Sequence, residues 1–217
     1  MKPGGENSYE EICEQWREEF QSINQETLLK KLPELKEEGD WLVLRHFHRK
    51  FGVNRDSGEI KPLEDSGHVT CYEKMNLYAL FRAPSEGARF QDEWTPFEKL
   101  RGTAPFYRSF QANIVQPFAR MFQNRMETLT RACLELGGKK LTWSDAGFEL
   151  KAFDCIPIRF LFWEGDDEFP AQGNLLFDVS AADFIDEKSL IRVSLVGLGR
   201  IAERAGISMD PSAFLIF

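Results

Sequence analysis

The sequence predicts an α+β fold, with helices packed on an antiparallel or mixed β-sheet. Apolar residues recur at helical spacing through the N-terminal segment and again through residues 105–138. From residue 141 the pattern changes to the alternation that is typical of strands. Helices and strands come in blocks, without internal repeats and without strict βαβ alternation, which favours α+β over a parallel α/β fold. We expect one α+β domain over residues 1–217, with a helical N-terminal segment at about 7–39.

Two helices and a group of short strands are predicted for the first third of the chain. Residues 7–22 place an apolar side chain at every fourth position, which predicts an amphipathic helix. Asn24 can cap a second short helix, which "EEGD" ends. Residues 41–63 have no helical stripe and predict two or three short strands, with a turn at "RDSG".

Helical spacing returns in the middle third of the chain. The stretch "SGHVTCYEKMNLYALFRAP" predicts a helix that ends at Pro84. In "EWTPFEKLRG", Thr95 as N-cap, Pro96 at the first helical position and Glu98 as the partner in a capping box predict a short helix. A long helical region follows, in which Pro117 separates two helices or bends one.

The last third of the chain predicts a buried sheet and then two helices. Both faces of "CIPIRFLFW" are apolar, so this strand is expected to be covered on both sides, with Pro157 near an edge or a bulge. "NLLF" is expected to pair with it across an acidic loop, residues 164–173. Ser180 and Asp183 are expected to cap a short helix, and "DEKSLIRVSLVGLGRIAERAG" predicts a longer one. The apolar tail, residues 214–217, is expected to dock on the body.

Composition and charge argue against several classes of function. The chain has 27 Lys and Arg against 35 Asp and Glu, a net charge of −8, so we expect no nucleic-acid partner. The four cysteines are far apart and have no metal-ligand spacing, which favours reduced, buried thiols over a disulfide framework. No apolar run approaches membrane-spanning length and the N-terminus has no signal-peptide core. We therefore expect a soluble, cytoplasmic protein with no membrane partner.

The candidate site is the acidic interruption in "FLFWEGDDEFPAQGNLLFD", residues 160–178. Four carboxylates fall within five residues, directly after an indole, and a further acid ends the next predicted strand. The candidate ligand-binding residues are Trp163, Glu164, Asp166, Asp167, Glu168 and Asp178. Gly165 would let the backbone fold round a hard cation such as Mg²⁺ or Ca²⁺, which prefers oxygen ligands. Phe169 is expected to dock inward and to pin the turn against the core.

Two interpretations of this loop stay open. The spacing of the acids differs from that of an EF-hand, and alternation along a strand would direct neighbouring carboxylates apart. A solvated or locally hydrogen-bonded turn is therefore favoured over a metal site. The sequence assigns no cofactor and no catalytic residue.

Three further patterns support weaker hypotheses. On a strand, His46 and His48 would share a face and could bind a transition metal with a third ligand, although an exposed polar face is favoured. The Gly-Leu-Gly at 197–199 lies inside a predicted helix, so helix packing explains it better than a dinucleotide site. Cys155 could act as a nucleophile, but a buried structural thiol is favoured.

Three stretches of the chain together resemble one known family. They are "LYALFRAP…WTPFEKLRG", "PFYRSFQANIVQPFARMFQNR" and, most specific, "IPIRFLFWEGDDEFPAQGNLLFDVSAADFIDEK". They resemble a bacterial and archaeal family of domains of unknown function, number 3786 in its series, from about residue 40 to residue 206. The resemblance implies occurrence in anaerobes, at times beside or fused to a four-cysteine iron–sulfur domain related to partners of corrinoid proteins. This chain has no such cysteine motif, so a cluster would belong to a partner.

Three functions follow as hypotheses. The first is a binding or accessory module in anaerobic metabolism, with a redox, iron–sulfur or corrinoid protein as partner and the acidic turn as contact surface. The second is a divalent-cation-dependent hydrolase or phosphoryl-transfer enzyme that uses the acids of residues 164–168. The third is a structural or oligomerisation domain.

Overall fold

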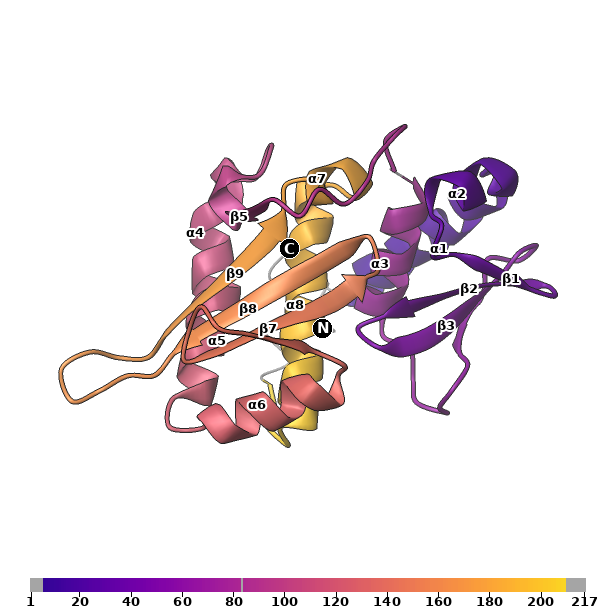
Figure 1. Ribbon diagram of the computed structural model, residues 1–217. Helices are drawn as coiled ribbons and strands as arrows, with labels where there is room; N and C mark the ends of the chain where they lie inside the picture. Colours follow the sequence, from indigo (N-terminus) through magenta and orange to yellow (C-terminus); the bar gives the residue numbers. More distant parts are fainter. Residues whose placement is uncertain (1–5, 83, 210–217) are drawn as a thin grey trace.

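The computed structural model describes residues 6–82 and 84–209 of the chain. It contains two antiparallel sheets, with the strand orders β1-β2-β3-β4 and β5-β9-β8-β7-β6, and helices that pack beside them (Figure 1). The predicted α+β class is therefore confirmed. The predicted docking of residues 214–217 lies outside the described residues. Among the described residues, none of the helices combines the length and the apolar character that crossing a membrane requires.

The four-stranded sheet and three helices form one side of the molecule (Figure 1). These helices are α1, Glu6–Gln21; α2, Gln25–Lys31; and α3, Cys71–Arg82. The strands are β1, Lys36–Glu38; β2, Trp41–His46; β3, Arg49–Asn54; and β4, Ile60–Pro62. The Asn24 side chain accepts the Thr27 N–H at 2.9 Å, so the predicted cap of α2 is confirmed.

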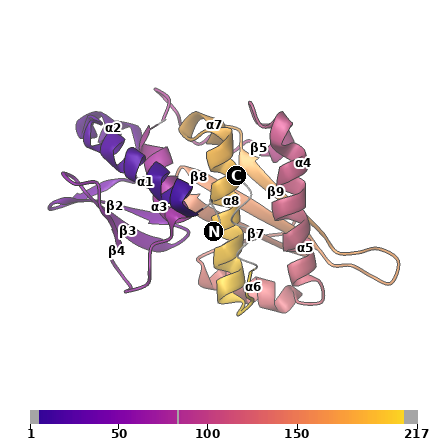
Figure 2. The same ribbon diagram turned by 180° about the vertical axis from the view of Figure 1, so that it is seen from behind.

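The five-stranded sheet forms the other side, and helices cover one of its faces (Figure 2). Its strands are β5, Trp94–Pro96; β6, Lys139–Leu141; β7, Ala146–Phe153; β8, Ile156–Trp163; and β9, Gln172–Asp178. The helices are α4, Tyr107–Phe110; α5, Gln116–Phe122; α6, Met126–Glu135; α7, Ala181–Phe184; and α8, Glu187–Arg204.

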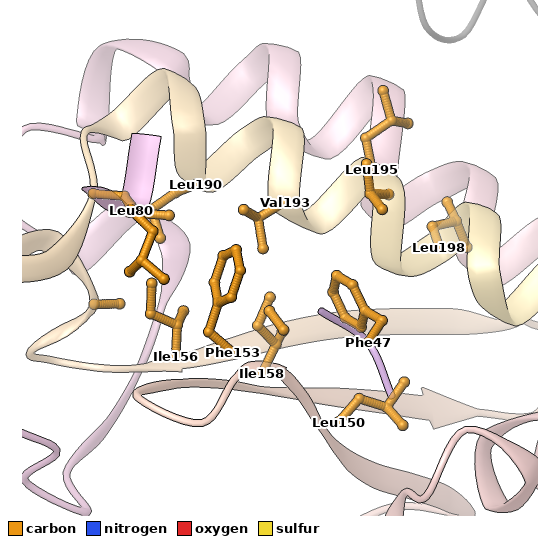
Figure 3. Packing of buried hydrophobic residues seen from close by; sticks show 14 of the residues in the cluster. Phe47, Leu80, Leu150, Phe153, Ile156, Ile158, Leu190, Val193, Leu195 and Leu198 are labelled. Atoms are coloured by element: carbon orange, nitrogen blue, oxygen red, sulfur yellow. The ribbon is translucent and has the colours of Figure 1, made fainter. Parts of the chain in front are cut away.

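The core lies between α8 and the central strands of the five-stranded sheet (Figure 3). Every residue of β8 except Trp163 is buried, as the apolar character of both its faces predicts. Ile158 points toward α8, where Val193 faces it, and Leu190 lies beside Leu80 (Figure 3). Burying one such side chain fully contributes about 1.5–3 kcal/mol, so this contact is a main source of stability.

The two sheets are linked by a hydrogen bond at a bulge in β7. The pairing of β7 with β8 shifts between Lys151 and Phe153, next to Pro157, which confirms the predicted bulge. Ala152 has no register partner in β8, and its carbonyl oxygen instead accepts the backbone N–H of Phe47 at 3.2 Å. Phe47 belongs to the two-residue turn between β2 and β3, and its ring lies in the core beside Leu150 (Figure 3).

Gly197 of α8 makes room for that ring. A Cβ atom at this position would lie 2.6 Å from Cζ of Phe47 and 3.1 Å from Cζ of Phe160. The helix-packing interpretation of this glycine is therefore confirmed.

Two predictions for the middle of the chain need correction. Residues 94–96 form β5, which pairs with β9, and a 3₁₀ turn follows at Phe97–Lys99 in place of the predicted capped helix. The helix-start signal of this segment is overridden because pairing with β9 satisfies the backbone hydrogen-bonding groups of residues 94–96. Pro117 does not separate two helices, because a π-helical segment, Gln111–Val115, leads directly into α5. The alternative, that Pro117 bends one helix, stays a prediction. The chain breaks instead at Asn124, whose φ is +60°.

Candidate functional site

The predicted acidic loop joins β8 to β9 and projects from the body of the molecule (Figures 1 and 2). It spans residues 164–171, because β8 ends at Trp163 and β9 begins at Gln172. Trp163 pairs with Gln172 and is half-buried, whereas residues 166–170 are exposed. The base of the loop thus lies where β8 ends and β9 begins, and its tip, residues 166–170, is in solvent.

Hydrogen bonds within the tip fix its conformation. The Asp166 N–H donates to the carbonyl oxygen of Phe169 at 2.9 Å. In return, Oδ1 of Asp166 accepts the N–H groups of Glu168 at 2.9 Å and Phe169 at 2.7 Å. These backbone donors lower the pKa of Asp166. Asp166 therefore stabilises the turn itself, as the locally bonded interpretation requires.

Gly165 allows the two arms of the loop to approach closely. A Cβ atom there would lie 2.5 Å from the backbone nitrogen of Ala171 and 2.8 Å from the carbonyl oxygen of Phe169. Any larger residue would push the arms apart, so this glycine has a steric role in the turn.

Glu164 anchors the base of the loop. Its N–H donates to Asp145 Oδ2 at 2.8 Å, and its own Oε1 accepts the N–H of Asn124 at 2.9 Å. These contacts tie the loop to the β6–β7 turn and to the α5–α6 turn. The Glu164 carboxylate is thus directed at the body and away from the tip.

Phe169 is exposed, so the prediction that it docks inward is wrong. Its side chain is 62% exposed. The physical reason is that the arms of the hairpin extend past the sheet and the helices, so that no core lies beside the tip. Asp167 and Glu168, which directly precede it, are exposed as well.

Asp178 lies far from the loop. It is fully buried at the opposite end of β9, six residues after Gln172, which is roughly 20 Å along a strand. Its oxygens accept the N–H groups of Gln91 at 3.2 Å, Glu93 at 3.0 Å and Ser180 at 3.0 Å, and also the Ser180 hydroxyl. This carboxylate therefore holds the segment before β5 against the start of α7.

The six candidate residues thus do not form one cluster. Trp163 and Glu164 belong to the base of the loop, Asp166, Asp167 and Glu168 to its tip, and Asp178 to the far end of the strand. In the part of the chain that the structure describes, no three His, Cys, Asp or Glu side chains are arranged to hold a metal ion.

The two histidines of the "HFH" stretch differ in burial and in local structure. β2 ends at His46, which is buried, whereas His48 lies in the turn and is exposed. His46 Nδ1 lies 2.7 Å from the Ala152 carbonyl oxygen and donates to it, so Nε2 accepts from Asn76 Nδ2 at 3.2 Å. Burial lowers the pKa of His46 to about 4. Neither the shared metal site nor the exposed polar face is correct for this pair.

The cysteines are free thiols, and three of them are buried. Burial raises the pKa of Cys155 far above its usual value, and the nearby Glu34 raises it further. A thiol in this environment is protonated, which agrees with the structural role that was favoured for Cys155.

Sequence reasoning missed a second region, which contains buried arginine. Arg49 is buried beside the loop that joins β4 to α3, and Arg200 and Arg204 of α8 lie opposite, with a cleft between them. The basic stretch "RHFHRK" was the only local signal of Arg49. Its partners Asp65 and Glu73 are 16 and 24 residues away, beyond the reach of a local pattern.

The fold and the loop define the class of protein: an α+β domain with an ordered, projecting acidic hairpin. The family model described as "Domain of unknown function (DUF3786)" matches residues 27–197, and the chain belongs to this family. The match begins and ends earlier than the region from about 40 to 206 that the motifs delimited. No curated protein matches the chain. No solved structure matches it either.

Proposed function

We propose that this protein is a binding or accessory module that contacts a partner protein through the tip of the β8–β9 hairpin. The observation that supports this most is Phe169, a large aromatic side chain that is 62% exposed on a turn with a fixed backbone. Aromatic residues dominate the energy of protein interfaces, and a preformed loop loses little conformational entropy on binding. The tip therefore has both the anchor and the rigidity that an interface needs.

The charge of the tip indicates the chemistry of the partner. Asp167 and Glu168 directly precede Phe169 and are exposed, and the chain as a whole has a net charge of −8. Charge complementarity predicts an apolar pocket with Lys or Arg at its rim. The family resemblance adds a finer proposal: a bacterial or archaeal anaerobe as source, and a redox, iron–sulfur or corrinoid protein as partner.

The alternative of a divalent-cation-dependent enzyme has less support. Asp166 and Glu164 accept backbone N–H groups from different segments, and Asp178 lies at the other end of β9. A structural or oligomer-forming role predicts that this chain associates with a second copy of itself, which light scattering on the purified protein measures directly.

Site-specific crosslinking tests the proposal. A photoreactive phenylalanine analogue at position 169 in the full chain should crosslink one basic protein in a lysate of the source organism, identified by mass spectrometry. A second analogue at Leu134, which is 52% exposed on α6, serves as the matched control and should not crosslink that protein.

Two variants then decide whether the contact is specific. Binding of the isolated partner should weaken at least about tenfold in F169S and in the charge reversal D167K/E168K, and remain unchanged in L134S. Equal binding by F169S and by the wild-type protein would refute the tip as the contact surface. A partner without redox, iron–sulfur or corrinoid chemistry would refute only the finer proposal.

A further inference from the structure

A cleft of about 550 Å³ lies between the end of α8 and the loop that joins β4 to α3. Pockets of this size are typical of small-molecule sites. A smaller hollow of about 200 Å³ shares Arg49, Asp65, Arg200 and Arg204 with it and also borders His48. The β4–α3 loop lies on the opposite side of α8 from the β8–β9 hairpin (Figures 1 and 2). The cleft is therefore distinct from the proposed partner surface.

The loop wall of the cleft is fixed by Arg49, whose donors are all in use. Its Nε and Nη2 donate to the two oxygens of Asp65 at 2.9 and 2.7 Å, and its Nη1 donates to Glu73 at 3.0 Å. The same guanidinium also donates to the backbone oxygens of Gly67 at 2.8 Å and His68 at 3.1 Å. One buried cation thus pairs with two carboxylates, so this wall is held rigidly and keeps a net charge of −1.

The α8 wall differs because its arginine donors are only partly used. Arg200 donates through Nη1 to Glu203 at 2.8 Å, but its Nε is buried and has no hydrogen-bond partner. Arg204 follows one turn later and is exposed, and among the described residues it has no ion-pair partner. Residues four apart on a helix lie on the same face, so both guanidinium groups border the cleft.

Helix electrostatics account for only part of this arrangement. A cation in the last turn of a helix is stabilised by the helix dipole, which explains Arg204 without a ligand. It does not explain a buried Nε–H of Arg200 without an acceptor, because leaving a buried donor unpaired is costly. None of the acids of the cleft accepts from this Nε in the structure: Asp65 and Glu73 bond to Arg49, and Glu203 bonds to Nη1.

We infer that this cleft binds a small organic anion, whose carboxylate or phosphate oxygens lie between Arg200 and Arg204. Planar guanidinium groups match the geometry of such oxyanions and bind them with two parallel hydrogen bonds. His68 and Thr70 border the same cleft and offer further polar contacts to the remainder of the ligand.

Isothermal titration of the 217-residue chain tests this inference. The probes are inorganic phosphate, pyrophosphate and citrate at low ionic strength, each compared with chloride at the same ionic strength. We expect at least one oxyanion to bind with millimolar or better affinity and to raise the melting temperature, and chloride to do neither. Binding of the phosphate probes but not of citrate would indicate a phosphorylated ligand. Binding of citrate alone would indicate a carboxylate ligand.

Three variants locate the site. R204Q changes an exposed side chain, so it should fold normally and weaken binding roughly tenfold, the usual cost of one charged hydrogen-bonding group. R200Q should weaken binding at least as much, and its unfolding midpoint reports whether it folds. R120Q changes an exposed arginine on α5 and should bind as the wild-type protein does. The inference is overturned if no oxyanion binds better than chloride, if R204Q binds normally, or if R120Q loses as much affinity.

Discussion

The two hairpins β2–β3 and β8–β9 each have a phenylalanine in the turn, yet the two rings have opposite environments. Phe47 is 2% exposed and packs against α8, whereas Phe169 is 62% exposed. The first turn has only two residues and the second has eight. The comparison shows that the position of an aromatic residue in a turn does not determine whether the ring is buried.

The two turns are also stabilised by different means. Phe47 and His48 have φ angles of 45° and 69°, a conformation that costs non-glycine residues roughly 1–2 kcal/mol each. Burial of the Phe47 ring, about 1.5–3 kcal/mol, and its hydrogen bond to Ala152 offset a cost of that size. The β8–β9 turn has no such strain and is held by the Asp166 side chain. The first turn therefore depends on its docking, and the second depends on its own sequence.

Truncating the two rings should give the largest difference between the hairpins. F47A should lower the free energy of unfolding by about 3–5 kcal/mol, because it removes a core ring and leaves a cavity. F169A should change it by less than about 0.5 kcal/mol, because the ring is already in solvent. Urea denaturation followed by tryptophan fluorescence measures both. Similar losses in the two variants would show that the comparison is wrong.

Acid should weaken the docking of the first hairpin and leave the second turn intact. Folding lowers the pKa of His46 from 6.5 to about 4, so His46 stabilises the fold above pH 6.5 and loses this contribution as the pH falls toward 4. The loss by pH 4 should be about 3 kcal/mol. Asp166 has a lowered pKa and stays ionised further into acid, so its turn should persist.

The variant H46Q isolates this effect, because glutamine does not titrate. The fall in the free energy of unfolding between neutral pH and pH 4 should be about 3 kcal/mol smaller in H46Q than in the wild-type protein. An unchanged pH dependence would mean that another group is responsible.

A smaller effect is expected where α8 meets the Phe47 ring. In an exposed helix, replacing glycine by alanine stabilises by about 1 kcal/mol. In G197A, the new Cβ would meet Cζ of Phe47 at 2.6 Å, and overpacking of this kind costs about 1–3 kcal/mol. We therefore expect a net loss of about 1 kcal/mol by thermal or urea unfolding. A stabilised G197A would show that the hairpin can shift away from α8.

Elements with long periodic patterns were predictable from the sequence. Apolar spacing predicts the helices α1 and α8 and the buried strand β8. The spacing is visible because the neighbouring elements bury one face of α1 and both faces of the strand. Residues 93–102 were not predictable, since a helix-start signal competes there with pairing to a strand about 80 residues later. Local chemistry favoured the helix, and the distant partner decided the outcome.

The candidate site was predictable in position but not in geometry. The interruption between two apolar runs correctly located a loop between β8 and β9, and the locally bonded turn was among its interpretations. The exposure of the Phe169 ring was not predictable, because it depends on whether a core lies beside the turn. The arginine cleft was missed because Arg49 and Arg200 meet across the fold, and two arginines at the end of a helix are ordinary on their own.

The position of α8 in the chain has a consequence for biosynthesis. This helix covers β7 and packs against α3 and α6, and it supplies the space for the Phe47 ring. During translation, both sheets are complete by residue 178, but α8 is not complete until residue 204 has left the ribosome. Until then, the part of β7 that α8 covers and the Phe47 ring lack their final packing partner.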